Sequence, residues 1–172
     1  AMTALSRHLG PVVLALLGLL SVRIAAAPRT EVSSFTAQSF ASIQQAHAGR
    51  PFILSFWSVS CEPCGREIAV LADLHRKYPT VPILLVAADP PSVRKDVVRL
   101  LGTFALGGIE RWQFGDESVE RLRYSVDKRW AGELPRTYFF TATHERTAHS
   151  GVVDAKWLND WLAKAAESGS AK

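Results

Sequence analysis

The sequence predicts an α/β protein in which helices cover a central β-sheet, and three apolar runs carry this prediction. The runs at 52–57, 81–88 and 137–141 have the length and the branched or aromatic side chains of buried strands. Between these runs, apolar residues recur at the spacing of one helix face. The chain has 172 residues, of which 48% are hydrophobic, and this suffices for the core of one domain.

The charge of the chain argues against a nucleic-acid partner. The net charge is +4, and Asp and Glu residues stand between the Lys and Arg residues along the sequence. Proteins that bind nucleic acids gather basic side chains on one face or stripe, which this distribution does not predict.

Residues 1–27 have the order of a secretory signal peptide: a short basic stretch, an apolar run over 9–22 and small residues at 25–27. The apolar run is shorter than the roughly 20 residues that cross a bilayer, which favours a cleaved signal. Cleavage after residue 27 would leave Pro28 first, and proline hinders peptidases, so an uncleaved N-terminal membrane anchor is the alternative. Both interpretations predict a periplasmic or otherwise extracytoplasmic domain.

The rest of the chain divides into a linker, one domain and a tail. Residues 28–34 are polar and without period, which predicts a linker, although a short extended piece at 32–35 enters the domain. Residues 35–167 form the predicted domain, and residues 168–172 a frayed tail.

The strand at 52–57 leads through a turn at 58–60 into a helix that holds both cysteines of the chain in its first turn. Cys61 and Cys64 stand three residues apart, which places their side chains on one helix face, close enough for a disulfide. The free N–H groups and the positive dipole end of the helix stabilise a thiolate on Cys61. The pattern therefore predicts a redox site.

A structural disulfide and a zinc site are the alternatives for this cysteine pair. A structural disulfide stabilises mainly by closing a long loop, and this pair closes almost none. A tetrahedral zinc site needs four ligands, and the chain has no second cysteine pair and no His-x-x-x-His motif. We therefore predict no metal at the pair.

Six residues around the cysteine pair form a motif: Trp57, Cys61, Glu62, Pro63, Cys64 and Glu67. This motif resembles the thioredoxin superfamily, in particular the TlpA and ResA branch of bacterial extracytoplasmic thiol:disulfide oxidoreductases. The resemblance implies the thioredoxin fold, with a central mixed β-sheet flanked by helices on both faces, and a redox-active disulfide without a cofactor. Glu62, Pro63 and Trp57 are the residues expected to tune the redox couple. Many members carry a tryptophan where this chain has Ser60.

Apolar spacing and turn residues predict the remaining elements. They are a helix over about 38–47 that Thr36 can cap, the strand at 81–88, a helix from 93 to about 104 that Ser92 can cap, an edge strand at 112–114, a helix from 117 to about 130, a last strand at Val152 and Val153, and a closing helix over 155–166.

The stretch Leu134-Pro135-Arg136-Thr137 precedes an apolar run and resembles the proline loop of the thioredoxin family. The resemblance implies a cis Pro135 packed against the cysteine pair and a role for this residue in the active site. It also implies an exposed backbone at Leu134, to which an extended substrate can add as a strand, so Leu134 and Thr137 are candidate substrate-binding residues. A trans proline that opens a strand is the alternative.

Cys61 is the predicted nucleophile because it stands at the helix start and is the more exposed thiol, and Cys64 is the resolving thiol. Glu62 places negative charge beside the Cys61 thiolate, which should raise the pKa of that thiol and favour a reductant. By resemblance, Glu67 is an active-site acid that handles the proton of one thiol, and a solvated helix charge is its alternative.

The resulting hypothesis is an exported reductant of protein disulfides, for example those of apocytochrome c during cytochrome c maturation. The expected partners are protein disulfide substrates and a membrane thiol donor of the DsbD or CcdA type, and we expect a monomer. A periplasmic Cu(I)-handling protein that uses both cysteines with His144 or His149 is a second hypothesis. A disulfide-forming oxidase is a third.

Overall fold

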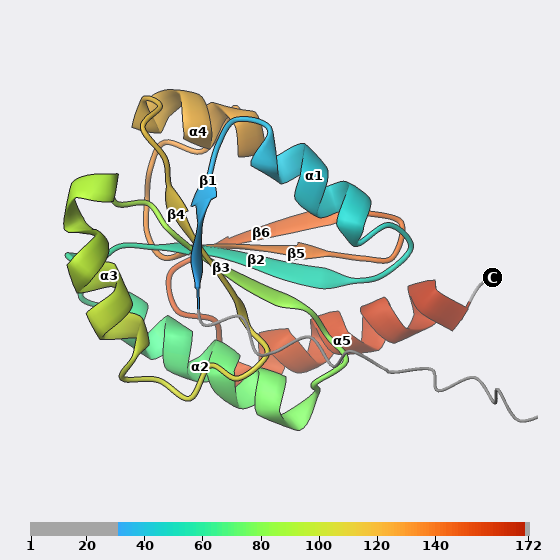
Figure 1. The fold of residues 1–172 in the computed structure, drawn as a ribbon. Helices are drawn as coiled ribbons and strands as arrows, with labels where there is room; N and C mark the ends of the chain where they lie inside the picture. The colour runs from blue at the N-terminus through green and yellow to red at the C-terminus, as the bar shows by residue number, and fades with distance from the viewer. Residues whose placement is uncertain (1–30, 171–172) are drawn as a thin grey trace, which may run out of the picture.

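The computed structural model describes residues 31–170, so the predicted signal peptide at 1–27 lies outside the described residues. One six-stranded sheet has the strand order β1-β4-β3-β2-β5-β6, and helices cover both of its faces (Figure 1). The strands are β1 (Val32–Phe35), β2 (Phe52–Trp57), β3 (Ile83–Ala87), β4 (Glu110–Phe114), β5 (Arg136–Phe140) and β6 (Arg146–Ser150). The helices are α1 (Ser39–Ala46), α2 (Cys64–Lys77), the 3-10 turn η1 (Pro91–Val93), α3 (Arg94–Leu101), α4 (Val119–Val126) and α5 (Ala155–Ser170).

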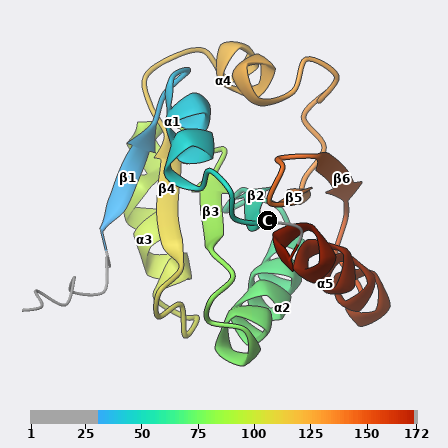
Figure 2. The ribbon, with the colours of Figure 1, turned by 90° about the vertical axis from the view of Figure 1, so that its right-hand side faces the viewer.

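The sheet is mixed, as the resemblance implied. The four strands β1, β4, β3 and β2 run parallel to one another, whereas β5 lies antiparallel to both β2 and β6. Figure 2 shows this order across the sheet, from β1 at one edge to β6 at the other. All six residues of β2 are buried, because β2 lies in the middle of the sheet and is covered on both faces. The predicted fold class is therefore confirmed.

Two hydrophobic clusters fill the space between the sheet and the helices. Helices α2, α3 and α5 cover one face, and α1 and α4 cover the other (Figure 1). The first cluster includes Ile53, Trp57, Ile68, Val97, Leu101, Phe139 and Trp161. The second includes Phe52, Leu54, Phe56, Ile43, Leu122, Tyr138 and Phe140. Residues of β2 and β5 thus alternate between the two faces, as a pleated strand requires.

The structure corrects two strand predictions. The short extended piece expected at 32–35 is the strand β1, which pairs with β4, so residues 32–34 of the expected linker belong to the sheet. The strand predicted at 112–114 is not an edge strand, since β4 lies between β1 and β3. The last strand is β6 and not Val152 and Val153, which follow it. Most side chains of β6 are exposed, so its sequence shows no apolar alternation.

Two predicted helix caps are wrong. The N-cap of α1 is Gln38, without a side-chain cap, and the carbonyl of Thr36 rather than its hydroxyl accepts a hydrogen bond from the Ser39 amide. Helix α3 follows the turn η1, its N-cap is Val93, and Ser92 does not cap it.

Helix bounds also differ from the prediction. Helix α3 ends at Leu101, and α4 covers only Val119–Val126, where the Ser118 side chain accepts a hydrogen bond from the Arg121 amide. Helix α5 continues to Ser170, into the segment expected to fray. Between residues 31 and 170, none of the helices has the length and apolar content needed to span a membrane.

Candidate functional site

A disulfide joins Cys61 and Cys64, with their Cα atoms 5.4 Å apart. Helix α2 begins at Cys64, with Pro63 as its N-cap. Cys61 therefore lies in the turn before the helix, whereas it was predicted to lie in the first helical turn. The turn is closed by a 3.1 Å hydrogen bond from the Cys64 amide to the Cys61 carbonyl. The pair still lies at the positive end of the α2 dipole, where a thiolate is stabilised.

The two sulfur positions differ in exposure. Cys64 is 1% exposed and belongs to the cluster beneath α2, whereas Cys61 is half-buried and packs on the edge of that cluster. An incoming disulfide can therefore reach the sulfur of Cys61 but not that of Cys64. This asymmetry agrees with the predicted order of attack.

Glu67 follows Cys64 by three residues on α2, and its side chain is fully buried. Its Oε1 accepts a 2.7 Å hydrogen bond from the Thr137 hydroxyl, and its Oε2 accepts a 2.9 Å bond from the Val153 amide. Burial raises the pKa of Glu67 above its ordinary 4.5, although both hydrogen bonds and the charge of His149 oppose that shift. The alternative of a solvated helix charge is wrong.

Ser55 extends this polar network beneath the cysteine pair. Its hydroxyl lies 2.8 Å from the Thr137 hydroxyl, and both residues are fully buried. Because the single hydroxyl proton of Thr137 is donated to Glu67, the Ser55 hydroxyl donates to Thr137. Nothing in the sequence indicated that Val153 belongs to this network, because Val152 and Val153 were expected to form a strand.

The three residues expected to tune the redox couple lie in different surroundings. Trp57 is fully buried and shares a cluster with Cys64, and its indole N–H makes no hydrogen bond within the described residues. Glu62 is exposed beside Cys61, and Pro63 is half-buried at the helix start. The cysteine pair thus packs against buried apolar residues such as Trp57, whereas Glu62, which follows Cys61 in the chain, is exposed to solvent.

The proline loop has the predicted backbone. The Leu134-Pro135 peptide bond is cis, and Pro135 is buried directly before β5. Leu134 is half-buried and contacts both hydrophobic clusters, one of which also contacts Cys61. Thr137 does not face a substrate, because its side chain is fully buried and bonded to Glu67. Its side chain is therefore not available for the predicted role in substrate binding.

Neither histidine proposed as a copper ligand is shown beside the cysteines. The His144 ring stands against Phe52 at the start of β2, whereas Cys61 follows the other end of that strand. The His149 ring lies against Trp157, and His149 is paired across the sheet with Thr137. The described part of the chain contains no group of three or more His, Cys, Asp or Glu side chains that could hold a metal ion.

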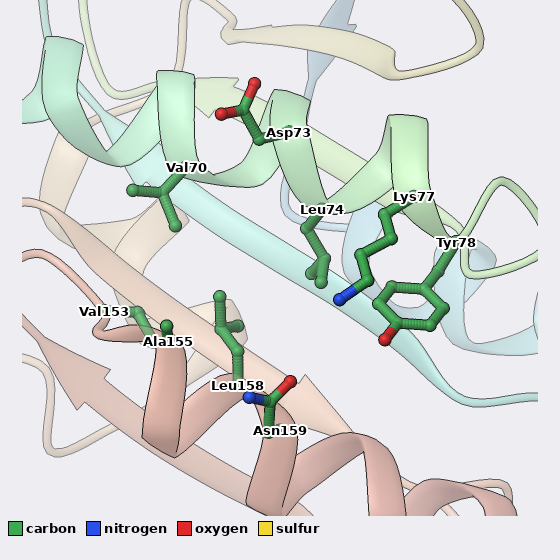
Figure 3. Close-up of a pocket in the computed structure, with 9 residues that line it drawn as sticks. All are labelled: Val70, Asp73, Leu74, Lys77, Tyr78, Val153, Ala155, Leu158 and Asn159. Carbon is green, nitrogen blue, oxygen red and sulfur yellow. The ribbon is translucent and has the colours of Figure 1, made fainter.

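A pocket of about 280 Å³ lies between the later turns of α2 and the start of α5 (Figure 3). Apolar side chains of Val70, Leu74 and Leu158 line it, and the side chain of Lys77 extends from α2 beside Tyr78. Val153 also lines this pocket and links it to the site, since the Val153 amide binds Glu67. None of the residues predicted for the site lines the pocket.

Several solved structures share the fold of this chain. A thiol:disulfide interchange protein of the thioredoxin family from Chlorobium tepidum superposes with a TM-score of 0.57 at 15% identity, over 71% of this chain and 83% of that one. A secreted Mycobacterium tuberculosis disulfide oxidoreductase homologous to Escherichia coli DsbE gives 0.54 at 16% identity, over 70% and 85%. BsSco, of the Sco family of cytochrome c oxidase assembly proteins, gives 0.54 at 18% identity, over 74% and 85%.

No family model matches the chain, and none of the curated proteins matches it significantly. At these identities the solved structures establish the fold. The chain is a thioredoxin-fold protein. It carries a disulfide between the two cysteines of a Cys-x-x-Cys motif at the start of α2.

Proposed function

We propose that this protein is a thiol:disulfide oxidoreductase that reduces protein disulfides through Cys61 and Cys64. The observation that carries the proposal is the unequal exposure of the two cysteines, with Cys61 half-buried and Cys64 1% exposed above the buried carboxyl group of Glu67. A structural disulfide has no need of an accessible sulfur at a helix start or of an acid buried one turn behind it.

Catalysis begins with attack of the Cys61 thiolate on one sulfur of a substrate disulfide. A mixed disulfide forms, and the other substrate sulfur leaves as a thiolate and takes up a proton. Cys64 then gives its proton to the Glu67 carboxylate and attacks the sulfur of Cys61. The second substrate thiolate leaves, so the substrate gains two electrons and the Cys61–Cys64 disulfide forms.

The raised pKa of Glu67 suits this proton transfer, because it brings the proton affinity of the carboxylate closer to that of a thiol. Cys64 and Glu67 are three residues apart on α2 and therefore lie on the same side of the helix. The return of Cys61 and Cys64 to the dithiol requires a second dithiol that takes the disulfide by the same exchange.

The proposed direction is reduction, and two features support it. Glu62 follows Cys61 directly in the chain, and its negative charge opposes the thiolate that the helix dipole favours. Strong oxidants depend on an unusually stable thiolate, and the motif has no histidine or lysine to provide one.

The location and the partners belong to the same proposal. The signal-like sequence at 1–27 supports export, and export of a reductant requires a membrane thiol donor of the DsbD or CcdA type. Apocytochrome c is the proposed client, by the likeness of the motif to ResA-like proteins, and the protein is proposed to act as a monomer.

Equilibration with glutathione and a turnover assay test this function. The Cys61–Cys64 couple should be more reducing than glutathione, and the reduced protein should cleave the disulfides of insulin. Cys64→Ser should accumulate mixed disulfides through Cys61, because the resolving thiol is missing, whereas Cys61→Ser should form none. A couple as oxidising as that of DsbA would make the protein an oxidase, and trapping through Cys64 would reverse the assigned roles.

A further inference from the structure

Asp89 lies two residues after the end of β3, and only 6% of it is exposed. Both oxygens of its carboxylate accept hydrogen bonds from the turn that precedes Cys61. Oδ1 accepts a 2.8 Å bond from the Ser58 hydroxyl, and Oδ2 accepts a 3.0 Å bond from the Val59 amide. The sequence suggested only that Asp89 ends a strand.

Ser58 connects the Asp89 carboxylate to Cys61. The Cys61 amide donates a 3.1 Å hydrogen bond to the Ser58 carbonyl. The Ser60 amide donates to the Ser58 hydroxyl oxygen over 3.3 Å, and the two serine hydroxyl groups are 3.1 Å apart. One carboxylate thus fixes the whole turn from which Cys61 is presented.

The sheet holds Asp89 itself in place. Gln113 of β4 is fully buried, and its amide group donates to the carbonyl oxygens of Pro90, over 2.7 Å, and of Asp89, over 3.4 Å. Arg94 of α3 donates to the Gln113 side chain and to the carbonyl of Val32 in β1. The turn is therefore tied through Asp89 to β4 and to the edge of the sheet.

No cation neutralises this carboxylate directly. Among residues 31–170, Asp89 makes no ion pair, and Arg94 reaches it only through Gln113. Arg94 is the first charged residue after Asp89 in the chain, and Glu62 is the first charged residue after the turn 58–60.

We propose that Asp89 is a positioning residue for the redox reaction, which holds the turn 58–60 so that the sulfur of Cys61 stays within reach of Cys64. This inference rests on the proposed function. Fixing the turn raises the effective concentration of one thiol at the other, which favours the disulfide. The negative charge of Asp89 acts in the same direction, because it disfavours a thiolate on Cys61. Both effects make the couple more reducing.

Asp89→Asn tests the inference, with Ser58→Ala as a second variant. Asparagine keeps the shape of the side chain but removes its charge and one of its two acceptors. Ser58→Ala keeps the charge and removes the hydroxyl that joins Asp89 to Ser60. Asp96→Asn is the matched control, since Asp96 is an exposed acid of α3 paired with Arg99.

We expect the equilibrium constant for oxidation by glutathione to fall about tenfold in Asp89→Asn, which corresponds to about 30 mV. In Ser58→Ala it should fall at least threefold, and in Asp96→Asn it should stay within twofold of the wild type. The equilibrium requires only folded protein with both cysteines, so it can be measured whether or not insulin is reduced.

An unchanged equilibrium constant in Asp89→Asn would overturn the inference. A change in Asp89→Asn without one in Ser58→Ala would also overturn it, because the restraint through the Ser58 hydroxyl would then have no effect on the couple. If Asp89→Asn does not fold, the result for Ser58→Ala decides. Failure of insulin reduction by the wild type, with the expected shifts in equilibrium, would instead contradict the proposed function.

Discussion

The hydroxyl of Thr137 donates a 2.7 Å hydrogen bond to Oε1 of Glu67, although the two residues are 70 positions apart in the sequence. This bond joins β5, which begins directly after Pro135, to α2, which begins at Cys64. The Cys-x-x-Cys motif and the proline loop, which both resemble the thioredoxin family in sequence, are thus connected through the buried carboxylate of Glu67. The pKa of that acid depends on its burial and on residues from β5, β6 and the segment after β6, namely Thr137, His149 and Val153.

Glu67→Gln should remove a pH dependence of stability. Burial raises the pKa of Glu67 above 4.5, so between that pH and the pKa in the folded state the folded protein binds more protons than the unfolded chain. The free energy of unfolding contributed by Glu67 therefore falls as the pH rises through this window. Urea unfolding of the oxidised proteins should show the wild type losing stability relative to Glu67→Gln as the pH rises from 4.5 through the pKa of Glu67 in the folded state.

Glu62→Gln is the matched control for this experiment, because it makes the same chemical change at an exposed position. The stability difference between Glu62→Gln and the wild type should stay nearly constant over the same range. A constant difference for Glu67→Gln as well would mean that Glu67 does not titrate differently in the two states. At all pH values, Glu67→Gln should also lose about 1 kcal/mol of unfolding free energy, since the glutamine side chain presents an N–H group to either the Thr137 hydroxyl or the Val153 amide, where the carboxylate presents an acceptor.

Thr137→Val should destabilise the protein by about 1–3 kcal/mol, because it leaves a buried oxygen of Glu67 and the Ser55 hydroxyl without their partner. The bond from Thr137 lowers the pKa of Glu67, so its removal should raise that pKa further. The loss of stability should then be larger at about pH 8 than at about pH 5, since the ionised carboxylate needs the donor more.

Thr137→Ser keeps the hydroxyl and removes only a methyl group, so it should lose less stability and keep the pH dependence of the wild type. Urea unfolding of both variants at the two pH values measures the difference. Equal losses in Thr137→Val and Thr137→Ser would show that the methyl group, and not the hydrogen bond, is what matters at this position.

Copper binding separates the reductase from the carrier hypothesis. The reduced protein should bind Cu(I) no more tightly than a simple dithiol, because His144 lies at the far end of β2 and no three-residue metal cluster occurs in the described chain. Competition against a Cu(I) chelator measures the affinity. His144→Ala and His149→Ala should leave it unchanged, and tight binding that either variant abolishes would favour the carrier.

The sequence predicted the site better than it predicted the edges of the sheet. The apolar run of β2 and the helical spacing of α2 are strong signals, because both elements are buried along their length or on one face. Strand β6 was not predicted because most of its side chains are exposed, and β1 was expected only as a short extended piece because its two middle residues are exposed serines. A strand that takes part in a sheet through its backbone alone leaves little trace in the side-chain pattern.

The polar residues behind the cysteines were harder to predict for another reason. A glutamate on a helix is usually exposed, so only the resemblance indicated a special role for Glu67. Ser55 and Asp89 carry no motif of their own, and their roles depend on which strands become neighbours. Pairing of β2 with β5 places Ser55 opposite Thr137, and pairing of β2 with β3 brings Asp89 to the turn before Cys61.

Tyr138→Phe should reduce stability without changing the redox equilibrium. Tyr138 is fully buried on the face covered by α1 and α4, and its hydroxyl donates a 3.3 Å hydrogen bond to Asp127. Loss of this bond should cost about 1 kcal/mol, because Arg136 and Arg146 still pair with the carboxylate of Asp127. The equilibrium with glutathione should not change, since Glu67 and Cys64 lie on the opposite face; a shift above threefold would contradict this separation of the faces.

The same variant should alter the response to alkali. Burial raises the pKa of Tyr138 from 10.0 to about 12, so between these values the folded protein keeps a proton that the unfolded chain has lost. The free energy of unfolding of the wild type should therefore fall between about pH 10 and about pH 12, and that of Tyr138→Phe should fall less. Urea unfolding at about pH 9 and about pH 11 measures the two slopes. Equal slopes would mean that the phenol titrates alike in both states, and that its bond to Asp127 opens in the folded protein before alkali unfolds it.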